Sequence, residues 1–289
     1  MLRYAAAPFW RSAHRALGYL RPPTSAFRIL LFHDVPPDQA PAFSRLLHHI
    51  YDHHGIISPD DAECWLRGGN QGKCSRVGHR PCLISFDDGF RSNYEVARSI
   101  LGPLGIKALF FIAPGLTELP EERQPQAIAS QIFRGAIHAD DLPSHQRLMT
   151  WQQLAKLRDD GHVIGCHGLS HNRLRGLAPD KLKAEIAEAR NIMNHRLGGE
   201  TPWYAFAFGD ISSIDRQALG IIGRNFSLCR SGIRGENHAH LSPLALHADS
   251  ISLSTPFSYQ KLLAEGGIDS FYGTPRRQLL EMAANLDGH

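Results

Sequence analysis

Two short polar groups in the sequence have the residue types of a hydrolytic metal site. Asp87 and Asp88 stand side by side directly after the apolar run at 83–86, where a buried strand is expected to end. His167 and His171 are four positions apart and also follow an apolar run, so both imidazoles can face the same cation. Two imidazoles and one carboxylate form a suitable ligand set for Zn²⁺ or another divalent first-row metal.

The two adjacent aspartates are expected to have separate functions, because successive side chains at the end of a strand diverge. Either Asp88 or Asp87 would complete the ligand set, and the other would accept a proton from water whose pKa the metal lowers. Three protein ligands leave coordination positions open for water, as a hydrolytic site requires. A nearby cation also favours the ionised form of both carboxylates, so it explains why two of them are tolerated there.

The elements that must position these residues alternate between strands and helices. Helical patterns separate short apolar runs that are typical of strands. Polar residues repeatedly follow the strand residues, and in parallel α/β barrels the site forms at the carboxyl ends of the strands. The sequence therefore predicts an α/β chain of about seven parallel strands with one shared site. The expected strands lie in the ranges 27–35, 81–89, 106–115, 162–167, 204–209, 226–230 and 241–251.

Length and composition fit one globular domain. The chain has 289 residues, a common size for a single-domain α/β barrel. The formal net charge of +3 is too small to indicate nucleic-acid binding, and no block of Lys and Arg alternates with aromatic residues. The five cysteines are odd in number and form no Cys-x-x-Cys pair, so we predict no disulfide framework and a reducing compartment.

The amino-terminal segment has two interpretations. Its apolar run at 4–10 contains Pro8 and is followed by Arg11, so we predict no cleavable signal peptide. The sequence contains no run of about 18 apolar residues, so we predict no membrane-spanning helix. Because arginines alternate with aromatic and aliphatic residues, residues 1–20 either form a leader or helix on the body of the protein, or lie on a membrane surface. The expected location is cytoplasmic, with a membrane-peripheral one as the alternative.

The stretches around the candidate site residues resemble the polysaccharide deacetylase family (carbohydrate esterase family 4), with its chitooligosaccharide-deacetylase-like domain. The motif FDDG stands at 86–89, and WQQLAKLRDDGHVIGCHGLSHNRL stands at 151–174. The flanking stretches RILLFHDV at 28–35 and YAFAFGD at 204–210 are also similar. The resemblance covers residues 27–255, so it implies a catalytic barrel there, a leader or peripheral helix at 1–26, and a helical extension at 256–289 packed on the barrel.

The resemblance implies a fold, a reaction and a role for each site residue. The family fold is a distorted parallel (β/α) barrel with fewer than eight strands. By position in the motifs, Asp87 is the general base, and Asp88, His167 and His171 hold one divalent ion, with Zn²⁺ expected and Co²⁺ or Fe²⁺ as alternatives. The reaction is removal of an N-acetyl group from an amino sugar: metal-bound water attacks the amide carbonyl, and the metal and a backbone N–H hold the oxyanion.

The sequence departs from the family pattern in the third motif. Many members have Arg-x-Pro-x-Gly there, and the Arg orients the base. Here the stretch is AFAFG, with Ala205 in place of Arg and Ala207 in place of Pro. The chain is closer to a branch with Phe-Ala-Tyr-Pro-Phe-Gly, so the residue that orients Asp87 is open. For the general acid, the family's Leu-x-x-His motif indicates His247, and His33 at the end of the first strand is the competing candidate.

Several alternatives remain open at this stage. The substrate of a deacetylase would be a free, lipid-linked or polymeric acetylated sugar. An alternative activity is deformylation of a lipid-linked amino sugar. A different class is a non-catalytic carbohydrate-binding relative, which the missing Arg favours and the complete set of two Asp and two His opposes. The histidines of the helical run at 41–54 (His48, His49, His53 and His54) are interpreted as a solvated helix face.

Overall fold

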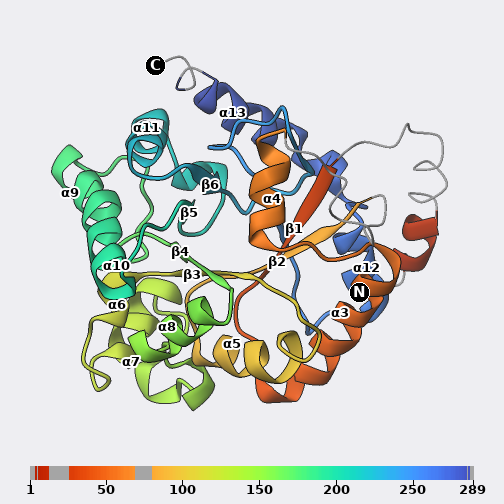
Figure 1. Cartoon of the computed structure of the whole chain (residues 1–289), viewed down its shortest axis with the longest axis horizontal. Helices are drawn as coiled ribbons and strands as arrows, with labels where there is room; N and C mark the ends of the chain where they lie inside the picture. Colours follow the sequence, from red (N-terminus) through yellow and green to blue (C-terminus); the bar gives the residue numbers. More distant parts are fainter. Residues whose placement is uncertain (1–3, 5, 13–25, 69–79, 285, 287–289) are drawn as a thin grey trace.

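Seven parallel strands curl into a distorted barrel (Figure 1), as the sequence predicts. The computed structural model describes residues 4, 6–12, 26–68, 80–284 and 286, so most of the predicted leader at 1–26 lies outside the described residues. The spatial order is β6-β5-β4-β3-β2-β1-β8, and the two-residue strand β7 (Asn237–His238) pairs antiparallel with β1. The parallel strands are β1 (Ala26–Phe32), β2 (Cys82–Phe86), β3 (Leu109–Ile112), β4 (Val163–Cys166), β5 (Trp203–Ala205), β6 (Leu228–Arg230) and β8 (Asp249–Ser250).

Alternating side chains divide each strand between two apolar clusters. In β1, Phe27, Ile29 and Leu31 belong to the cluster inside the barrel, whereas Leu30 and Phe32 belong to the cluster beneath the helices. This follows from the two-residue period of a strand, and burial on both faces explains why most residues of β1 to β6 are apolar. A parallel bridge between Arg230 and Leu246 joins β6 to the chain just before β8, on the side where the barrel is least regular.

Helices connect the strands and cover the outside of the barrel (Figure 1). Thr150 caps α8 through a capping box with Gln153, the start signal that its sequence predicts. The helix expected at 179–197 is continuous but contains a π-helical turn at 184–188. The main helices are α3 (Ala40–His53), α4 (Pro59–Leu66), α5 (Arg91–Val96), α8 (Trp151–Asp159), α9 (Pro179–Lys183), α10 (Ala189–Leu197), α11 (Arg216–Asn225), α12 (Phe257–Ala264) and α13 (Gly273–Ala283).

The excursion expected at 117–147 forms a small unit of its own at the carboxyl end of the barrel. The short helix α6 (Pro114–Thr117) leads into it, and α7 (Gln124–Ala127) within it continues into a π-helical turn at 128–132. Its core includes Ile128 and Leu142, which cluster with Phe90 from the start of α5. This unit is therefore fixed by its own apolar contacts beside the strand ends.

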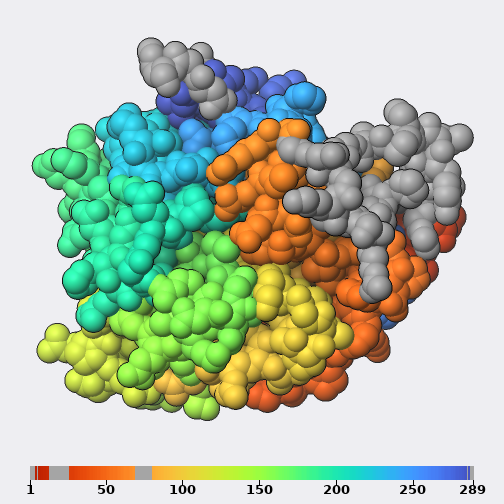
Figure 2. Space-filling view, in the orientation of Figure 1, coloured from red at the N-terminus to blue at the C-terminus, as the bar shows by residue number. Residues whose placement is uncertain are grey.

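Helix α4 closes the amino end of the barrel. Its Trp65 packs against Phe27 at the start of β1, with ring centroids 5.9 Å apart. Its Glu63 accepts a hydrogen bond of 2.7 Å from the indole N–H of Trp203 at the start of β5. Figure 2 shows α4, in orange, lying next to the blue carboxyl-terminal segments, far from it in sequence. This end is therefore a packed structural layer.

A buried ion network also lies at the amino end. Arg28 of β1 donates to both carboxylate oxygens of Asp249, at 2.8 and 3.0 Å, and to both of Asp269, at 3.0 and 2.9 Å. Arg28 and Asp249 are almost fully buried. Because a buried charge is tolerated only when it is paired and hydrogen-bonded, this network fixes β1, β8 and the chain after α12 to one another.

Candidate metal centre and active site

The structure brings Asp88, His167 and His171 together at the carboxyl ends of β2 and β4. One ligand atom from each lies within 4.8 Å of the others, and all three side chains are buried. Asp88 Oδ1 is 3.2 Å from Nε2 of His171 and 3.6 Å from Nε2 of His167. The three residues that the sequence singles out as a ligand set therefore converge on one point.

Backbone carbonyls fix the tautomer of both histidines. Nδ1 of His167 lies 2.8 Å from the carbonyl oxygen of Ala205, and Nδ1 of His171 lies 3.1 Å from that of Gln131. A carbonyl only accepts hydrogen bonds, so each Nδ1 carries a proton and donates it. In the neutral imidazoles each Nε2 is then an unprotonated lone-pair donor facing Asp88. This is the usual outer-shell arrangement of histidines that bind a metal.

The group fits a divalent cation. Asp88 Oδ1 is buried and has no hydrogen-bond partner among the described residues, an arrangement that is costly unless another group satisfies the oxygen. Ligand atoms about 2.0–2.2 Å from a tetrahedral Zn²⁺ stand roughly 3.3 Å apart, close to the separations of Asp88 from the two imidazoles. The donors, two nitrogens and one oxygen, suit Zn²⁺ and also Co²⁺ or Fe²⁺.

Burial and mutual charge shift the pKa values of the three residues in different directions. Burial opposes ionisation of Asp88, but the close contact with His171 and the nearby imidazoles of His33 and His167 outweigh it, so its pKa lies below the usual range. Burial lowers the pKa of His167 to about 4 despite the nearby Asp87. Burial also lowers the pKa of His171, but contact with Asp88 reverses this and raises it. The carboxylate is therefore ionised and His167 is neutral near neutral pH.

Strained backbone is concentrated around this group. Within the described ranges, only four non-glycine residues have φ in the left-handed region: Asp88 (68°), Arg134 (53°), His171 (60°) and Phe208 (65°). Two of them are ligand candidates, and the Phe208 ring packs edge-on against His171 at 4.7 Å. A non-glycine residue in this conformation costs about 1–2 kcal/mol, and such residues cluster at functional sites. Asp88, His171 and Phe208 follow β2, β4 and β5, so this strained backbone lies at the carboxyl end of the barrel.

Arg230 holds the second aspartate. Its guanidinium donates to Oδ1 of Asp87, and both residues are buried. Asp87 and Arg230 continue the inward-facing alternation of Leu83 and Leu228 on their strands, so they meet inside the barrel. The guanidinium also lies over the ring of Phe111 at 4.7 Å. Sequence reasoning missed Arg230; the available signal was a charged residue at the end of the apolar stretch FSLCR at 226–230.

The two candidate general acids lie at different levels of the barrel. His33 directly follows β1, is exposed, and is close enough to Asp88 to lower its pKa. Asp249 pairs with Leu30, so His247, two residues earlier, lies level with Arg28. Arg28 stands five residues before His33. At about 3.3 Å per residue, His247 is therefore roughly 16 Å from the level of His33.

The surroundings of His247 agree with this placement. His247 is buried, and burial together with Arg276 and Arg28 lowers its pKa to about 3. The structure does not bring His247 to the group of Asp88, His167 and His171, so its position gives no support to the prediction that it is the acid.

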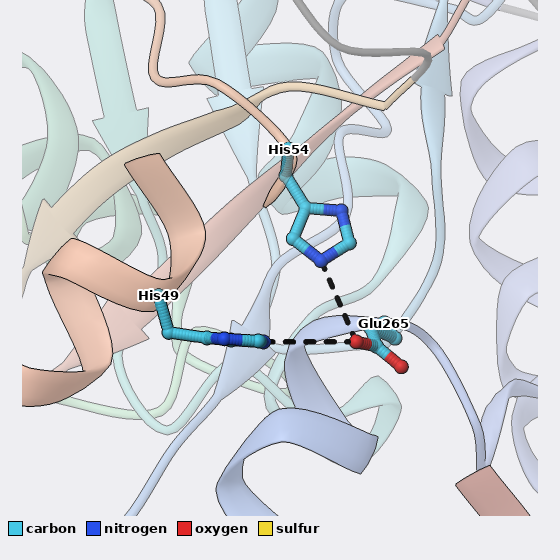
Figure 3. A group of neighbouring side chains, drawn as sticks. All are labelled: His49, His54 and Glu265. Atoms are coloured by element: carbon cyan, nitrogen blue, oxygen red, sulfur yellow. Dashed lines mark ion pairs between the residues drawn. The ribbon is translucent and has the colours of Figure 1, made fainter. Parts of the chain in front are cut away.

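A second group of two histidines and a carboxylate lies between α3 and the end of α12. Figure 3 shows His49 and His54 pointing at Glu265, with Nε2 to Oε1 distances of 3.9 and 3.5 Å. Their interpretation as a solvated face is therefore wrong, because these two side chains turn inward, whereas His48 and His53 are exposed.

Glu265 is already held by a guanidinium. Arg11 donates to both of its carboxylate oxygens, at 2.5 and 2.8 Å. Burial raises the pKa of Glu265, but His49, His54 and Arg11 outweigh burial and lower it well below the usual range. This group differs from that of Asp88 in having a protein cation in place, and it fastens the segment at 6–12 to the barrel.

Comparison with known proteins agrees with this geometry. The model of the polysaccharide deacetylase family matches residues 75–225 of the chain. The sequence is similar to YxkH of Bacillus subtilis (strain 168), whose name assigns it to the polysaccharide deacetylases: 23% of 189 aligned residues are identical. The alignment covers 63% of this chain and 56% of YxkH, so the chain spans about half the length of that relative.

Solved structures show the same fold. The deacetylase PplD of Streptococcus pyogenes, in complex with acetate, has a TM-score of 0.62 at 18% identity, over 83% of this chain and 98% of that one. IcaB from Ammonifex degensii has a TM-score of 0.62 at 20% identity, over 84% and 97%. A de-N-acetylase from Aggregatibacter actinomycetemcomitans has a TM-score of 0.64 at 15% identity, over 82% and 99%. Together with the match of its sequence over half its length, the barrel and its site lead to one conclusion: the chain belongs to the polysaccharide deacetylase family.

Proposed function

We propose that the protein is a metal-dependent hydrolase that removes the N-acetyl group from an amino sugar of a glycan or glycan precursor. The observation that carries this proposal is the buried trio of Asp88, His167 and His171 beside a second aspartate held by Arg230. Membership of the polysaccharide deacetylase family supports a carbohydrate deacetylase. A binding protein has no need of a charged base held in place next to a metal ligand set.

In this proposal each side chain at the site has one task. Asp88, His167 and His171 hold the cation, which when bound supplies a Lewis acid that lowers the pKa of water and polarises the amide carbonyl. Arg230 occupies Oδ1 of Asp87 and leaves Oδ2, which lies 3.7 Å from Nε2 of His167, on the side of the ligands. Asp87 Oδ2 is thus the oxygen that takes the proton from the attacking water.

We assign the general acid to His33. It lies at the carboxyl end of β1, where the other site residues gather, and it is exposed, so it can meet a leaving amine. His247 is the second candidate because of its motif, but it lies near Arg28 and Arg276. We expect His33→Ala to lower kcat strongly with metal content unchanged, and His247→Gln to retain kcat. Loss of turnover in the His247 variant alone would reverse the assignment.

The proposal is tested by an acetate-release screen with added Zn²⁺, Co²⁺ or Fe²⁺ over N-acetylated free sugars, nucleotide sugars and lipid-linked sugars. We expect one ion per chain, lost in His167→Ala. Asp87→Asn should keep the ion and abolish acetate release, which separates the base from the ligands. A chain that stays metal-free under these conditions, or an Asp87→Asn variant with full activity, would refute the mechanism. Formate release in place of acetate from a lipid-linked formylated sugar would identify a deformylase.

We also propose that the amino-terminal segment contacts a membrane surface. Within the described ranges no helix has the length and apolarity needed to cross a bilayer. Phe9 and Trp10 are 75% and 56% exposed, while Ala7 is buried and Arg11 is held by Glu265. The segment therefore packs on the body and turns two aromatic side chains outward, as interfacial binding requires. Sedimentation with anionic vesicles should fall in Phe9→Ser/Trp10→Ser; equal sedimentation would exclude this contact.

A further inference from the structure

A guanidinium without an acidic partner lies beside the metal centre. Arg134 is exposed, and its Cζ lies 5.2 Å from the centroid of the Phe208 ring. The same ring packs against His171 at 4.7 Å, so a single aromatic side chain separates Arg134 from a ligand candidate. The side chain of Arg134 has neither a hydrogen bond nor an ion pair with any other described residue, and it is exposed next to the site.

The other arginine on this ring is in the opposite situation. Arg173 lies over Phe208 at 4.4 Å. It donates to both carboxylate oxygens of Asp210, each at 3.0 Å, and to the hydroxyl of Ser213 at 2.5 Å. The charge of Arg173 is therefore balanced by the protein, whereas that of Arg134 is left for a ligand. Of the two arginines on this ring, Arg173 therefore has a structural role, and Arg134 is the one available to recognise a ligand.

The backbone at Arg134 points to the same conclusion. Its φ of 53° stands where the π-helical turn at 128–132 ends and Gly135 donates a backbone hydrogen bond of 2.8 Å back to Ala129. Helices that end in this left-handed conformation normally use Gly or Asn, because other residues cost about 1 kcal/mol there. An exposed side chain regains little of that cost through packing. Three residues earlier, the carbonyl of Gln131 accepts a hydrogen bond from His171, so the backbone that carries Arg134 is tied to the site.

From these contacts we propose that Arg134 forms a subsite for an oxyanion, a phosphate or a carboxylate, carried by the substrate next to its acetylated sugar. The inference rests on the proposed deacetylase function and names its substrate class: anionic rather than neutral N-acetyl sugars. A guanidinium presents two parallel N–H groups that match the two oxygens of either anion. The cation–π contact with Phe208 keeps the guanidinium next to the site.

The test compares Arg134→Gln with Arg98→Gln. Arg98 is the matched control, since it is also exposed and lies over a ring, that of Tyr94 at 5.7 Å, on another part of the barrel. The substrates are N-acetylglucosamine 1-phosphate, N-acetylmuramic acid and neutral N-acetylglucosamine. We expect Arg134→Gln to raise KM at least about tenfold for the anionic sugars, with kcat and the neutral sugar unaffected and Arg134→Lys intermediate. Comparison of the KM changes for the phosphorylated sugar and for the carboxylated sugar shows which anion the subsite binds.

A second measurement keeps this inference separate from the deacetylase proposal. Binding of inorganic phosphate to the metal-free chain is measured by calorimetry in the unaltered protein and in both variants. Weaker binding in Arg134→Gln alone supports the subsite even if no sugar releases acetate. Equal binding in all three proteins, or a KM change of the same size for neutral and anionic sugars, would overturn it.

Discussion

At the scale of single residues, Asp87 is held by Arg230, which lies outside the family's third motif. The family's usual arginine would stand at position 205, where this chain has Ala205. Ala205 pairs with Arg230 in the register between β5 and β6, so the guanidinium comes from the neighbouring strand at the same level and on the same inward face. The motif is altered, but Asp87 still has its charged hydrogen-bond donor.

This arrangement predicts a specific defect in Arg230→Ala. We expect kcat to fall about 10–100-fold, as for other outer-shell residues, with the bound metal unchanged because Asp88, His167 and His171 are intact. Millimolar guanidinium ions should restore part of the activity by filling the vacated position. The matched control is Asp87→Asn, which guanidinium should not rescue. Loss of the metal in Arg230→Ala would show that Arg230 supports the ligand set instead.

A buried histidine outside the site makes stability depend on pH. Nδ1 of His162 accepts a hydrogen bond of 3.1 Å from the amide of Ala108, and burial lowers the pKa of His162 from its usual 6.5 to about 4. The unfolded chain therefore binds a proton at higher pH than the folded one. It follows that the stability due to neutral His162 is complete above pH 6.5 and is lost as pH falls towards 4.

His162→Asn tests this dependence, because its side-chain oxygen can accept the same hydrogen bond without titrating. We expect the free energy of unfolding of the unaltered protein to fall by roughly 2–3 kcal/mol more than that of the variant between pH 7 and pH 4. Urea unfolding at a series of pH values measures both. Parallel curves for the two proteins would show that His162 does not titrate on unfolding.

At the scale of elements, the loops after β5 and β6 come into direct contact. Gly209 has φ of 67°, and a Cβ there would lie 2.5 Å from the backbone nitrogen of Gly232. The amide of Gly232 also donates to the carbonyl of Gly209 at 2.9 Å. These loops follow the strands that carry Ala205, the acceptor for His167, and Arg230, so their separation would disturb both supports of the site.

Gly209→Ala should therefore reduce both stability and activity. The comparison is Gly176→Ala, which has a similar φ of 74° but open space around the added carbon. Both variants place an alanine at a positive φ, so both lose stability for that reason. Only in Gly209→Ala does the new Cβ also clash with a neighbour, which should cost about 1–3 kcal/mol more. Thermal unfolding and kcat should show a larger loss for Gly209→Ala. Equal Tm values would mean that the two loops move apart freely.

The sequence predicts the strands and the grouping of Asp88, His167 and His171 for a physical reason. Apolar runs bounded by helical patterns fix the strands, and His167 and His171 are close in sequence, so local geometry already brings them together. Arg230 could not be predicted in this way, because its partner Asp87 is far away in the sequence. The two residues meet only because the barrel brings the ends of β2 and β6 together. The same holds for His49 and His54, which face a glutamate supplied by α12.

At the scale of the whole molecule, the two ends of the barrel have different tasks. The carboxyl end carries the strained backbone and the site residues. The amino end carries α4 and the ion network of Arg28, Asp249 and Asp269. Stability and chemistry are thus separated along the barrel axis, as in other parallel barrels.

Arg28→Leu tests this division. We expect a loss of about 3–5 kcal/mol of stability, because Asp249 is left buried without its partner, but little change in kcat at a temperature where the variant is folded. The control is Arg80→Leu, which removes a partly exposed contact of 3.4 Å with Glu236 and should cost less than about 1 kcal/mol. A large fall in kcat in folded Arg28→Leu would show that the two ends are coupled.

The register of Ala205 beside Arg230 has a consequence for how such chains are compared with one another. Two neighbouring positions can each present a guanidinium to the same carboxylate, and the barrel interior holds Arg230 in one of them. Across an alignment of relatives, arginine at these two positions is therefore expected to be mutually exclusive, so that its loss at one accompanies its gain at the other. A search that scores each column separately would count this chain as degenerate, whereas a pairwise covariation analysis would recognise the exchange.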